Sequence, residues 1–135
     1  MTEYFLDTNI IVSGLLWDGN ESEILRLANE GKINILTSYY VLDEVAHVLR
    51  DYFDFDKERV IEKISVIAPD FTRIVDVGKR EVLAHSKKLT DKMDAPILAA
   101  VVKSKAVLVT GDKRLAKEAK GLVKVISAKE LLSGV

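Results

Sequence analysis

Residues 4–9 read YFLDTN, an apolar run that stops at the polar residues Asp7-Thr8-Asn9. A short apolar run that ends at polar turn residues is typical of a buried strand. The run Ile33–Leu36 ends in the same way at Thr37-Ser38, and between the two runs the apolar residues of 24–28 recur at helical spacing. This first part of the chain therefore predicts a β-α-β unit.

The alternation of strand and helix patterns continues through the rest of the chain. Each later segment is recognised by an apolar stripe at helical spacing, by a short apolar run, or by a capping residue. The predicted segments are a helix over about 38–52, a helix that begins at Asp56 and ends by Pro69, a strand over 71–75, a charged helix over 79–89, a helix beyond Pro96, a strand over 106–109, a short helix around Leu115 and Ala119, a strand over 123–126 and a final helix capped by Ser127. This alternation predicts one α/β domain over residues 1–135 with a mostly parallel sheet.

The composition is that of a soluble globular domain, since 48% of the 135 residues are hydrophobic and 30% are charged. The absence of cysteine excludes a disulfide framework and thiolate zinc sites, and two histidines argue against a histidine-rich metal site. Any metal is therefore expected on oxygen ligands. No apolar run approaches the roughly 18 residues that span a bilayer, and the first residues carry acids where a secretory signal carries basic residues. We expect a cytoplasmic protein without a membrane span.

The charges are divided unevenly along the chain. Residues 1–67 carry six Lys/Arg and thirteen Asp/Glu, whereas residues 68–135 carry fourteen and eight. A basic half of this kind can mark a surface that faces nucleic acid, and it can equally be a solvated, lysine-rich exterior. The charge pattern leaves both interpretations open.

Three aspartates, Asp7, Asp94 and Asp112, stand just after a predicted strand or at the start of a predicted helix. Each one is explained locally as a helix cap, because Asp is a favoured N-cap residue. However, Asp7 and Asp112 both follow strands of one parallel sheet, and chemistry gathers at the carboxyl ends of such strands. We therefore expect these two carboxylates to be neighbours in space.

Helical spacing places further polar residues relative to the core. Asp94 lies three, four and seven residues before apolar positions of its helix, so its side chain is expected on the core-facing stripe. Glu44 borders the apolar stripe of its own helix, whereas Asp43 and His47 fall on the opposite side. We expect His47 and His85 to be surface residues rather than catalytic bases.

Convergence of Asp7, Glu44, Asp94 and Asp112 would place four like charges in one partly desolvated pocket. Such charges raise one another's pKa values unless cations compensate for them. Oxygen ligands select Mg²⁺ or Mn²⁺, and one or two such ions commonly support the attack of water on a phosphodiester. The chain has no cysteine, no Gly-x-Ser-x-Gly and no phosphate-binding glycine loop, which fits a reaction without a nucleophilic side chain.

The four acids and their flanking residues resemble the PIN domain family. The resemblance covers nearly the whole chain and rests on four segments in order: Leu6-Asp7-Thr8-Asn9, Glu44, DAPILAA at 94–100 and Val109-Thr110-Gly111-Asp112. It implies a three-layer α/β/α sandwich with a mostly parallel central sheet and the activity of a metal-dependent ribonuclease. The residues that it assigns to the coordination of Mg²⁺ or Mn²⁺ are Asp7, Glu44, Asp94 and Asp112. The stretch DTNIIVSGLLW at 7–17 is similar to the VapC-like toxin branch of the family.

The resemblance also implies roles for neighbours of the acidic quartet. Asn9 and Thr110 match positions that support or orient the acids, although Asn9 also fits a plain turn residue. Lys92, Lys113 and Arg114 adjoin two of the proposed ligands. They are candidates for contacts with RNA phosphates, or else ordinary surface residues.

For a toxin, the resemblance implies an antitoxin protein that covers the acidic pocket and a homodimer formed through the early helices. Leu15, Leu16 and Trp17 would supply apolar surface for the dimer or, alternatively, fill the core. Trp17, Tyr39 and Tyr40 are candidates for stacking on unpaired bases, but aromatic residues beside apolar runs are more often core or interface. An RNA-processing nuclease fits the same residues.

Two rival functions use some of these residues. A haloacid-dehalogenase-like phosphatase also has an aspartate after its first strand and a late Gly-Asp for Mg²⁺, which Asp7 and Gly111-Asp112 would match. That family has a second aspartate two residues after the first, where this chain has Asn9. The other rival is a non-catalytic PIN-like module that binds a partner protein. Cleavage of single-stranded RNA, release of phosphate from monoesters, or neither would distinguish the three.

Overall fold

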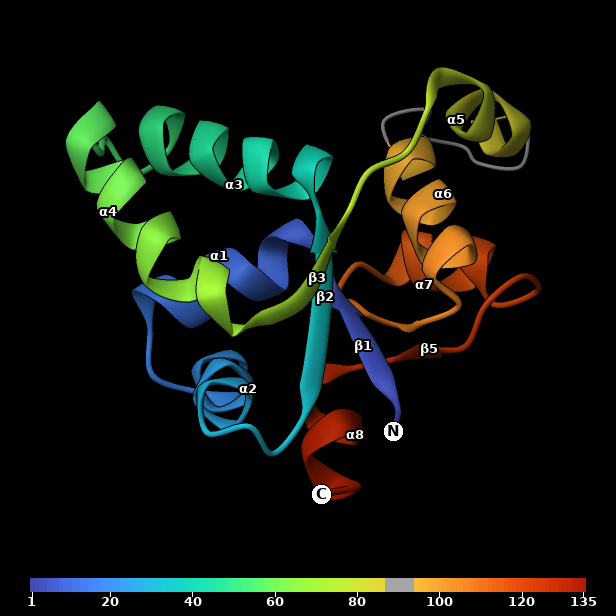
Figure 1. Ribbon diagram of the computed structural model, residues 1–135, viewed down its shortest axis with the longest axis horizontal. Helices are drawn as coiled ribbons and strands as arrows, with labels where there is room; N and C mark the ends of the chain where they lie inside the picture. The colour runs from blue at the N-terminus through green and yellow to red at the C-terminus, as the bar shows by residue number, and fades with distance from the viewer. Residues whose placement is uncertain (87–93) are drawn as a thin grey trace.

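A five-stranded sheet lies at the centre of the molecule, and each of its strand pairings is parallel (Figure 1). The computed structural model describes residues 1–86 and 94–135. The strands lie in the order β3-β2-β1-β4-β5, with the bounds β1 Glu3–Leu6, β2 Asn34–Ser38, β3 Phe71–Val75, β4 Val107–Val109 and β5 Val125–Ile126. Because β1 pairs with β4 as well as with β2, the carboxyl ends of β1 and β4 are neighbours at one edge.

Helices cover both faces of the sheet. The chain runs from β1 to β2 and β3 and then returns across the sheet to β4 and β5, and because parallel connections are right-handed this reversal puts the connecting helices on opposite faces. Figure 1 shows α1 to α4 on one face and α5 to α7 on the other, so the expected three-layer α/β/α architecture is confirmed. The helices are α1 Thr8–Leu16, α2 Asn20–Asn29, α3 Tyr39–Asp51, α4 Lys57–Ile67, α5 Lys79–Ser86, α6 Ala95–Ser104, α7 Lys113–Ala119 and α8 Ala128–Ser133, with a 3₁₀ turn at Ala68–Asp70.

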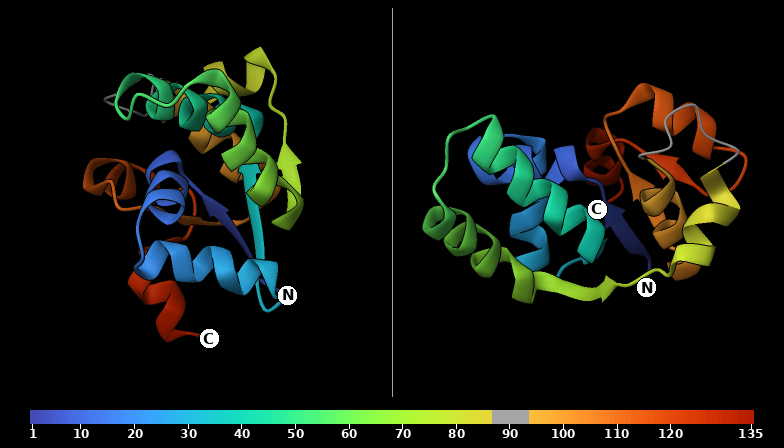
Figure 2. Two further views of the ribbon diagram at one scale, coloured as in Figure 1. Left: turned by 90° about the vertical axis from the view of Figure 1, so that its left-hand side faces the viewer. Right: turned by 90° about the horizontal axis from the view of Figure 1, so that it is seen from above.

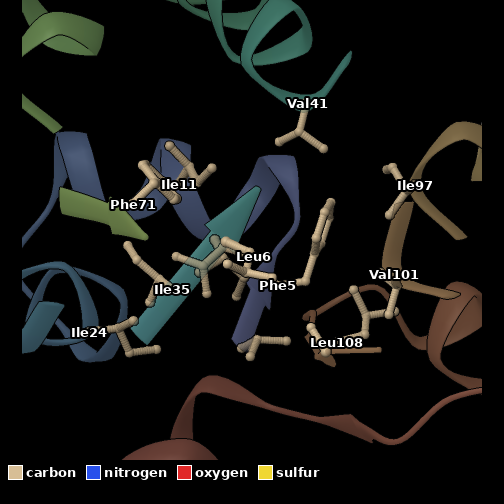
Figure 3. Close-up of a cluster of buried hydrophobic side chains, with 14 of the residues drawn as sticks. Phe5, Leu6, Ile11, Ile24, Ile35, Val41, Phe71, Ile97, Val101 and Leu108 are labelled. Carbon is tan, nitrogen blue, oxygen red and sulfur yellow. The ribbon is translucent and has the colours of Figure 1, made fainter. Parts of the chain in front are cut away.

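The core lies on both sides of β1. Phe5 and Leu6 are adjacent residues that point to opposite faces, and both are fully buried, as in a parallel strand that is covered on both sides. Figure 3 shows them within a cluster that includes Ile24 of α2 and Val101 of α6, from the two helical layers. Among the described helices, none is long and apolar enough to cross a membrane. The central place of β1 fixes the position of the residue that follows it, Asp7.

Most of the predicted elements are confirmed, and capping residues set their ends. Asp56 Oδ1 accepts a hydrogen bond from a backbone N–H (2.8 Å) at the start of α4, and Ser127 and Glu130 form a capping box at the start of α8. The helix predicted over 79–89 is present as α5, and its last three predicted residues lie outside the described part of the chain.

The sequence pattern did not predict a helix over residues 8–16, where the structure has α1. Its residues, TNIIVSGLL, carry apolar side chains around much of the helix, and Ile10, Ile11 and Val12 are buried in succession. A helix of this kind lacks the one-sided apolar stripe on which sequence prediction relies. Its composition is explained by its position, because α1 packs between the sheet and the helices α2 and α3.

Gly14 allows α1 and α2 to approach each other closely. A Cβ atom at Gly14 would lie 2.6 Å from Leu25 Cδ1 and 3.0 Å from the backbone oxygen of Glu21. We expect Gly14→Ala to lower the free energy of unfolding by about 1–3 kcal/mol, despite the better helix propensity of Ala, because the two helices must move apart. Urea denaturation measures this change, with Gly121→Ala as the control, since a Cβ at Gly121 meets nothing within 4 Å. Equal stability of both variants would show that the helices separate without cost.

Candidate active site

Asp7 lies where β1 ends and α1 begins. Its backbone N–H donates to the carbonyl oxygen of Val109, the last residue of β4 (3.3 Å). Its Oδ1 accepts from the Ile10 N–H (3.2 Å), so Asp7 is the N-cap of α1. Only 4% of the residue is exposed. Two strands and a helix start therefore hold this carboxylate at the carboxyl edge of the sheet.

Thr110 connects Asp7 to Asp112. The Thr110 hydroxyl donates to Asp7 Oδ2 and accepts from the backbone N–H of Asp112 (3.0 Å). Asp112 caps α7 through Oδ1, which accepts from the N–H groups of Arg114 (3.0 Å) and Leu115 (3.1 Å). The two aspartates that were expected to meet at this edge lie within electrostatic range of each other, and each of them also caps a helix.

Burial raises the pKa of Asp7 from 3.8 to about 6, because the ionised carboxylate loses hydration. The hydrogen bonds from Thr110 and from the Ile10 backbone lower this pKa, and the negative charge of Asp112 raises it. Any group that brings positive charge to this edge of the sheet therefore stabilises the ionised form of Asp7.

Glu44 reaches the same region from α3. It is half-buried, and its Oε1 accepts from the hydroxyl of Thr8 (2.8 Å), the residue next to Asp7. Its expected place at the border of the core is confirmed, and Asp43 beside it is exposed. Asp94 is the half-buried N-cap residue of α6, a helix that contacts α3, and its carboxylate makes no capping hydrogen bond. The Thr110 hydroxyl thus joins Asp7 to Asp112, the residue next to Asp7 holds Glu44, and Asp94 begins a helix that adjoins α3.

The donor chemistry of the site suits a hard divalent cation. The acids and threonine hydroxyls offer only oxygen, and the raised pKa marks Asp7 as a carboxylate whose charge is poorly compensated. In residues 1–86 and 94–135, no three His, Cys, Asp or Glu side chains are grouped closely enough to hold an ion by themselves. Mg²⁺ needs fewer protein side chains than this, because it keeps several of its waters and usually binds through one or two carboxylates and substrate phosphates. Asp7 and Asp112 are two carboxylates of the kind that such an ion uses.

The other polar residues that were expected around the acids have different surroundings. Asn9 is exposed, and its backbone N–H interacts with the Asp7 carboxylate. Lys113 and Arg114 are exposed in the first turn of α7, directly after the acidic pair. Lys92 lies outside the described residues. The structure therefore places two of the three basic candidates beside the acids.

The ring side chains that the sequence singled out differ in their exposure. His47 is exposed as expected, but His85 is half-buried and its Nδ1 is enclosed, because α5 packs against α6. Trp17 is 56% exposed and stands edge-on to Phe53, with ring centroids 5.6 Å apart, and Tyr39 is 57% exposed. Trp17 and Tyr39 lie outside the core because both stand at helix ends on the surface.

Thr8 is a part of the site that the sequence analysis did not single out. Its hydroxyl is the group that joins the start of α1 to Glu44, 36 residues further along the chain. The available signal was a hydroxyl residue in the first helical position directly after Asp7. Only the packing of α1 against α3 shows where that hydroxyl points.

Known proteins share both the sequence pattern and the fold of this chain. A family model described as PIN domain matches residues 3–114. Similar solved structures include PAE2754 from Pyrobaculum aerophilum, with a TM-score of 0.70 and 19% identity over 98% of this chain and 94% of that chain. VapBC2 from Rickettsia felis bound to a DNA fragment from their promoter (TM-score 0.68, 21% identity) and FitAcB from Neisseria gonorrhoeae (TM-score 0.67, 21% identity) each match over 93% of this chain and 98% of that chain. No curated protein matches the sequence.

Proposed function

Because the chain belongs to the PIN domain family, a family of nucleases, we propose that it is a metal-dependent endoribonuclease that hydrolyses phosphodiester bonds in RNA. The observation that carries this proposal is the buried carboxylate of Asp7, tied through Thr110 to Asp112 at the carboxyl edge of the sheet. A fold by itself does not assign an activity. An acidic pair with one buried member, at the edge where α/β sheets gather their chemistry, supports one.

The acids serve as ligands in this proposal, and water is the nucleophile. The pair Asp7 and Asp112 would hold Mg²⁺ or Mn²⁺ together with water, and Glu44 and Asp94 are the further ligands that the family pattern assigns. Such an ion, when bound, lowers the pKa of water and stabilises negative charge on the phosphoryl oxygens. The Thr110 hydroxyl orients Asp7, and the first N–H groups of α1 and α7 each hold one aspartate oxygen. Because hydrogen bonds already fix these oxygens, the acids need little rearrangement when a substrate arrives.

Basic residues next to the acids would hold the substrate. Lys113 and Arg114 are exposed beside Asp112, and together with Lys92 they are our candidates for contacts with RNA phosphates. Contacts of this kind position a strand without reading its sequence. Their loss should weaken cleavage of all RNA sequences alike and reduce the salt dependence of binding.

The Thr8–Glu44 hydrogen bond gives a test of how the acids are positioned. We expect Thr8→Val to lower metal-dependent cleavage about 10- to 100-fold, because Glu44 loses the hydroxyl that orients it. Thr8→Ser keeps the hydroxyl and should keep most of the activity. The rate measured against Mg²⁺ concentration should show a weaker apparent affinity for the metal in Thr8→Val alone. An equal loss in both variants would mean that Thr8 contributes its methyl group rather than its hydroxyl.

We further propose that the chain is the toxin of a toxin–antitoxin pair in the cytoplasm, with an antitoxin protein as partner. The fold that it shares with VapBC2 and FitAcB supports this role. The homodimer would use the end of α1, where Leu15 and Leu16 are half-buried and Trp17 is exposed beside Phe53. Exposed aromatic rings are enriched at protein interfaces. Sedimentation of the wild-type protein as a dimer and of Trp17→Ala as a monomer would support the dimer.

The nuclease proposal is tested by incubating the purified chain with end-labelled single-stranded RNA. Internal cleavage with Mg²⁺ or Mn²⁺, stopped by EDTA and absent in Asp112→Asn, would support it. Release of phosphate from small monoesters without cleavage of RNA would support a phosphatase instead. A chain that does neither, with both metals and over a range of RNA sequences, would be a binding module.

A further inference from the structure

A hollow of about 290 Å³ opens near the acidic pair, with both apolar and polar residues in its lining. Its walls come from the starts of α1 and α2, the turn after β4, and the start of α8, which packs against α2 (Figure 2). Two lining residues come from the same turns as the acids: Asn9 is two residues after Asp7, and Gly111 directly precedes Asp112. The hollow therefore adjoins the place where a phosphate would lie at the acids.

Four of the polar side chains that line the hollow are not used for hydrogen bonds inside the protein, and the carboxylate residue Glu21 lines it as well. Asn9, Ser13, Asn20 and Lys129 line it, and the described part of the chain supplies none of these four side chains with a hydrogen bond or an ion pair. An amide offers a donor and an acceptor side by side, a hydroxyl offers both, and lysine offers a positive charge. Groups of this kind read base edges and hold phosphates.

The charges around the site favour this side of the acids over the α3 side. A hollow of about 490 Å³ along α3 is lined by the carboxylates of Asp43, Glu44 and Asp51. Asp43 and Asp51, which are not assigned to the metal, repel a phosphate backbone there. By contrast, another hollow, of about 270 Å³, shares the turn after β4 with the first one, and in it Lys113 and Lys120 balance the charges of Asp112 and Glu130. A strand bound across that turn would meet lysine and carboxylate residues in equal numbers, and so less negative charge than along α3.

We infer that the hollow bordered by Asn9, Ser13, Asn20 and Lys129 receives one nucleotide of single-stranded RNA next to the scissile bond, and that its two asparagines select the base. This inference rests on the proposed nuclease function and adds a site of sequence preference to it. The base edges of unpaired RNA are open to such contacts, and an asparagine amide can make two hydrogen bonds to one base. Lys129 pairs with the phosphate of the same nucleotide.

Gly111 lines both hollows at the turn after β4, so a side chain there is a steric probe of RNA bound across that turn. A Cβ atom at Gly111 meets nothing within 4 Å, and its backbone does not have the positive φ that favours glycine. A larger side chain there should therefore leave the fold intact while it occupies space at the edge of the hollow. Gly121 is equally open and does not line the hollow, so Gly121→Leu is the matched control for Gly111→Leu.

The test combines cleavage with binding. Cut sites are mapped on a pool of randomised single-stranded RNA for the wild-type protein, Asn9→Ala, Asn20→Ala and the control Asn29→Ala, which removes an amide from the other end of α2. Binding of labelled RNA hexanucleotides in EDTA is measured for the wild-type protein, Gly111→Leu and Gly121→Leu. At one position beside the cut, we expect the preference for one base over the others to fall roughly tenfold in the two asparagine variants. We expect Gly111→Leu to bind RNA more weakly than Gly121→Leu.

The two readouts separate the inference from the proposed function. Wild-type cleavage with unchanged preference in Asn9→Ala and Asn20→Ala would overturn the inference and leave the nuclease standing. Absence of cleavage, with RNA binding that Gly111→Leu weakens, would remove the nuclease and keep the nucleotide site. If the wild-type protein neither cuts nor binds RNA, both are wrong. A uniform loss of cleavage at all sequences in the asparagine variants would assign them to backbone contacts and overturn base selection.

Discussion

The Asp7→Asn variant is expected to be more stable than the wild-type protein at pH 8 and to lose its metal-dependent cleavage of RNA. The pKa of Asp7 rises from 3.8 to about 6 on folding, so the ionised carboxylate opposes folding. At about 1.4 kcal/mol per pKa unit, removal of this charge stabilises the protein by at most about 3 kcal/mol. Asn is as good an N-cap as Asp, although the amide must find a new arrangement with Thr110, so a gain of about 1–3 kcal/mol is expected.

The pH dependence of this gain has a defined sign. Below pH 3.8, Asp7 is protonated in both the folded and the unfolded chain, so the two proteins should differ least there. Between pH 3.8 and about 6 the folded chain binds more protons than the unfolded one, and the stability of the wild-type protein relative to Asp7→Asn falls as pH rises. Above about pH 6 the difference is constant. Urea denaturation of both proteins at pH 4 and pH 8 measures it.

A matched control for Asp7→Asn is Asp56→Asn. Asp56 caps α4 with the same geometry, but it is exposed, so the exchange removes no buried charge. We expect it to change stability by a few tenths of a kcal/mol and to leave cleavage intact. An Asp7→Asn protein that is less stable than the wild type at pH 8 would show that the ionised carboxylate is needed for the fold. Retained cleavage in Asp7→Asn would remove Asp7 from the reaction.

Addition of MgCl2 is expected to raise the Tm of the wild-type protein strongly at pH 8 and weakly at pH 5. A cation at Asp7 and Asp112 compensates the buried charge, and a ligand at about 100 times its Kd adds about 3 kcal/mol to the free energy of unfolding. At pH 5 a proton occupies most Asp7 side chains, because their pKa is about 6. The apparent affinity for Mg²⁺ should therefore be about tenfold lower at pH 5 than at pH 8.

Screening by salt is separated from binding by a control with NaCl at the same ionic strength. The Asp7→Asn variant should gain little from MgCl2 at either pH, since one of the two carboxylates is gone. Thermal unfolding followed by circular dichroism measures all of these conditions. An equal rise of the Tm with MgCl2 and with NaCl at pH 8 would argue against a cation site, whatever the outcome of the cleavage assay.

Much of the fold was predictable because its signals are local. Asp56 and Ser127 cap helices through backbone groups three residues away, and the stripe of α3 depends on residues one turn apart. The exception is α1, whose apolar residues follow no single stripe because its surroundings bury it on several sides. The exposure of Trp17 was also not predictable. A large apolar residue that follows an apolar run can be buried with that run or can point into solvent, and the local sequence does not distinguish the two.

The sequence alone placed acids at the ends of strands and helices. It could not decide whether Asp7 and Asp112 cap helices or take part in a reaction. The structure shows that capping does not compete with a shared site: one oxygen of Asp7 caps α1 while the other accepts from Thr110, 103 residues away. The link from Thr8 to Glu44 and the raised pKa of Asp7 likewise come from packing. Caps and periodicity arise between near neighbours in the chain, so the sequence carries them. Burial and like-charge contacts arise between segments that only the tertiary structure brings together.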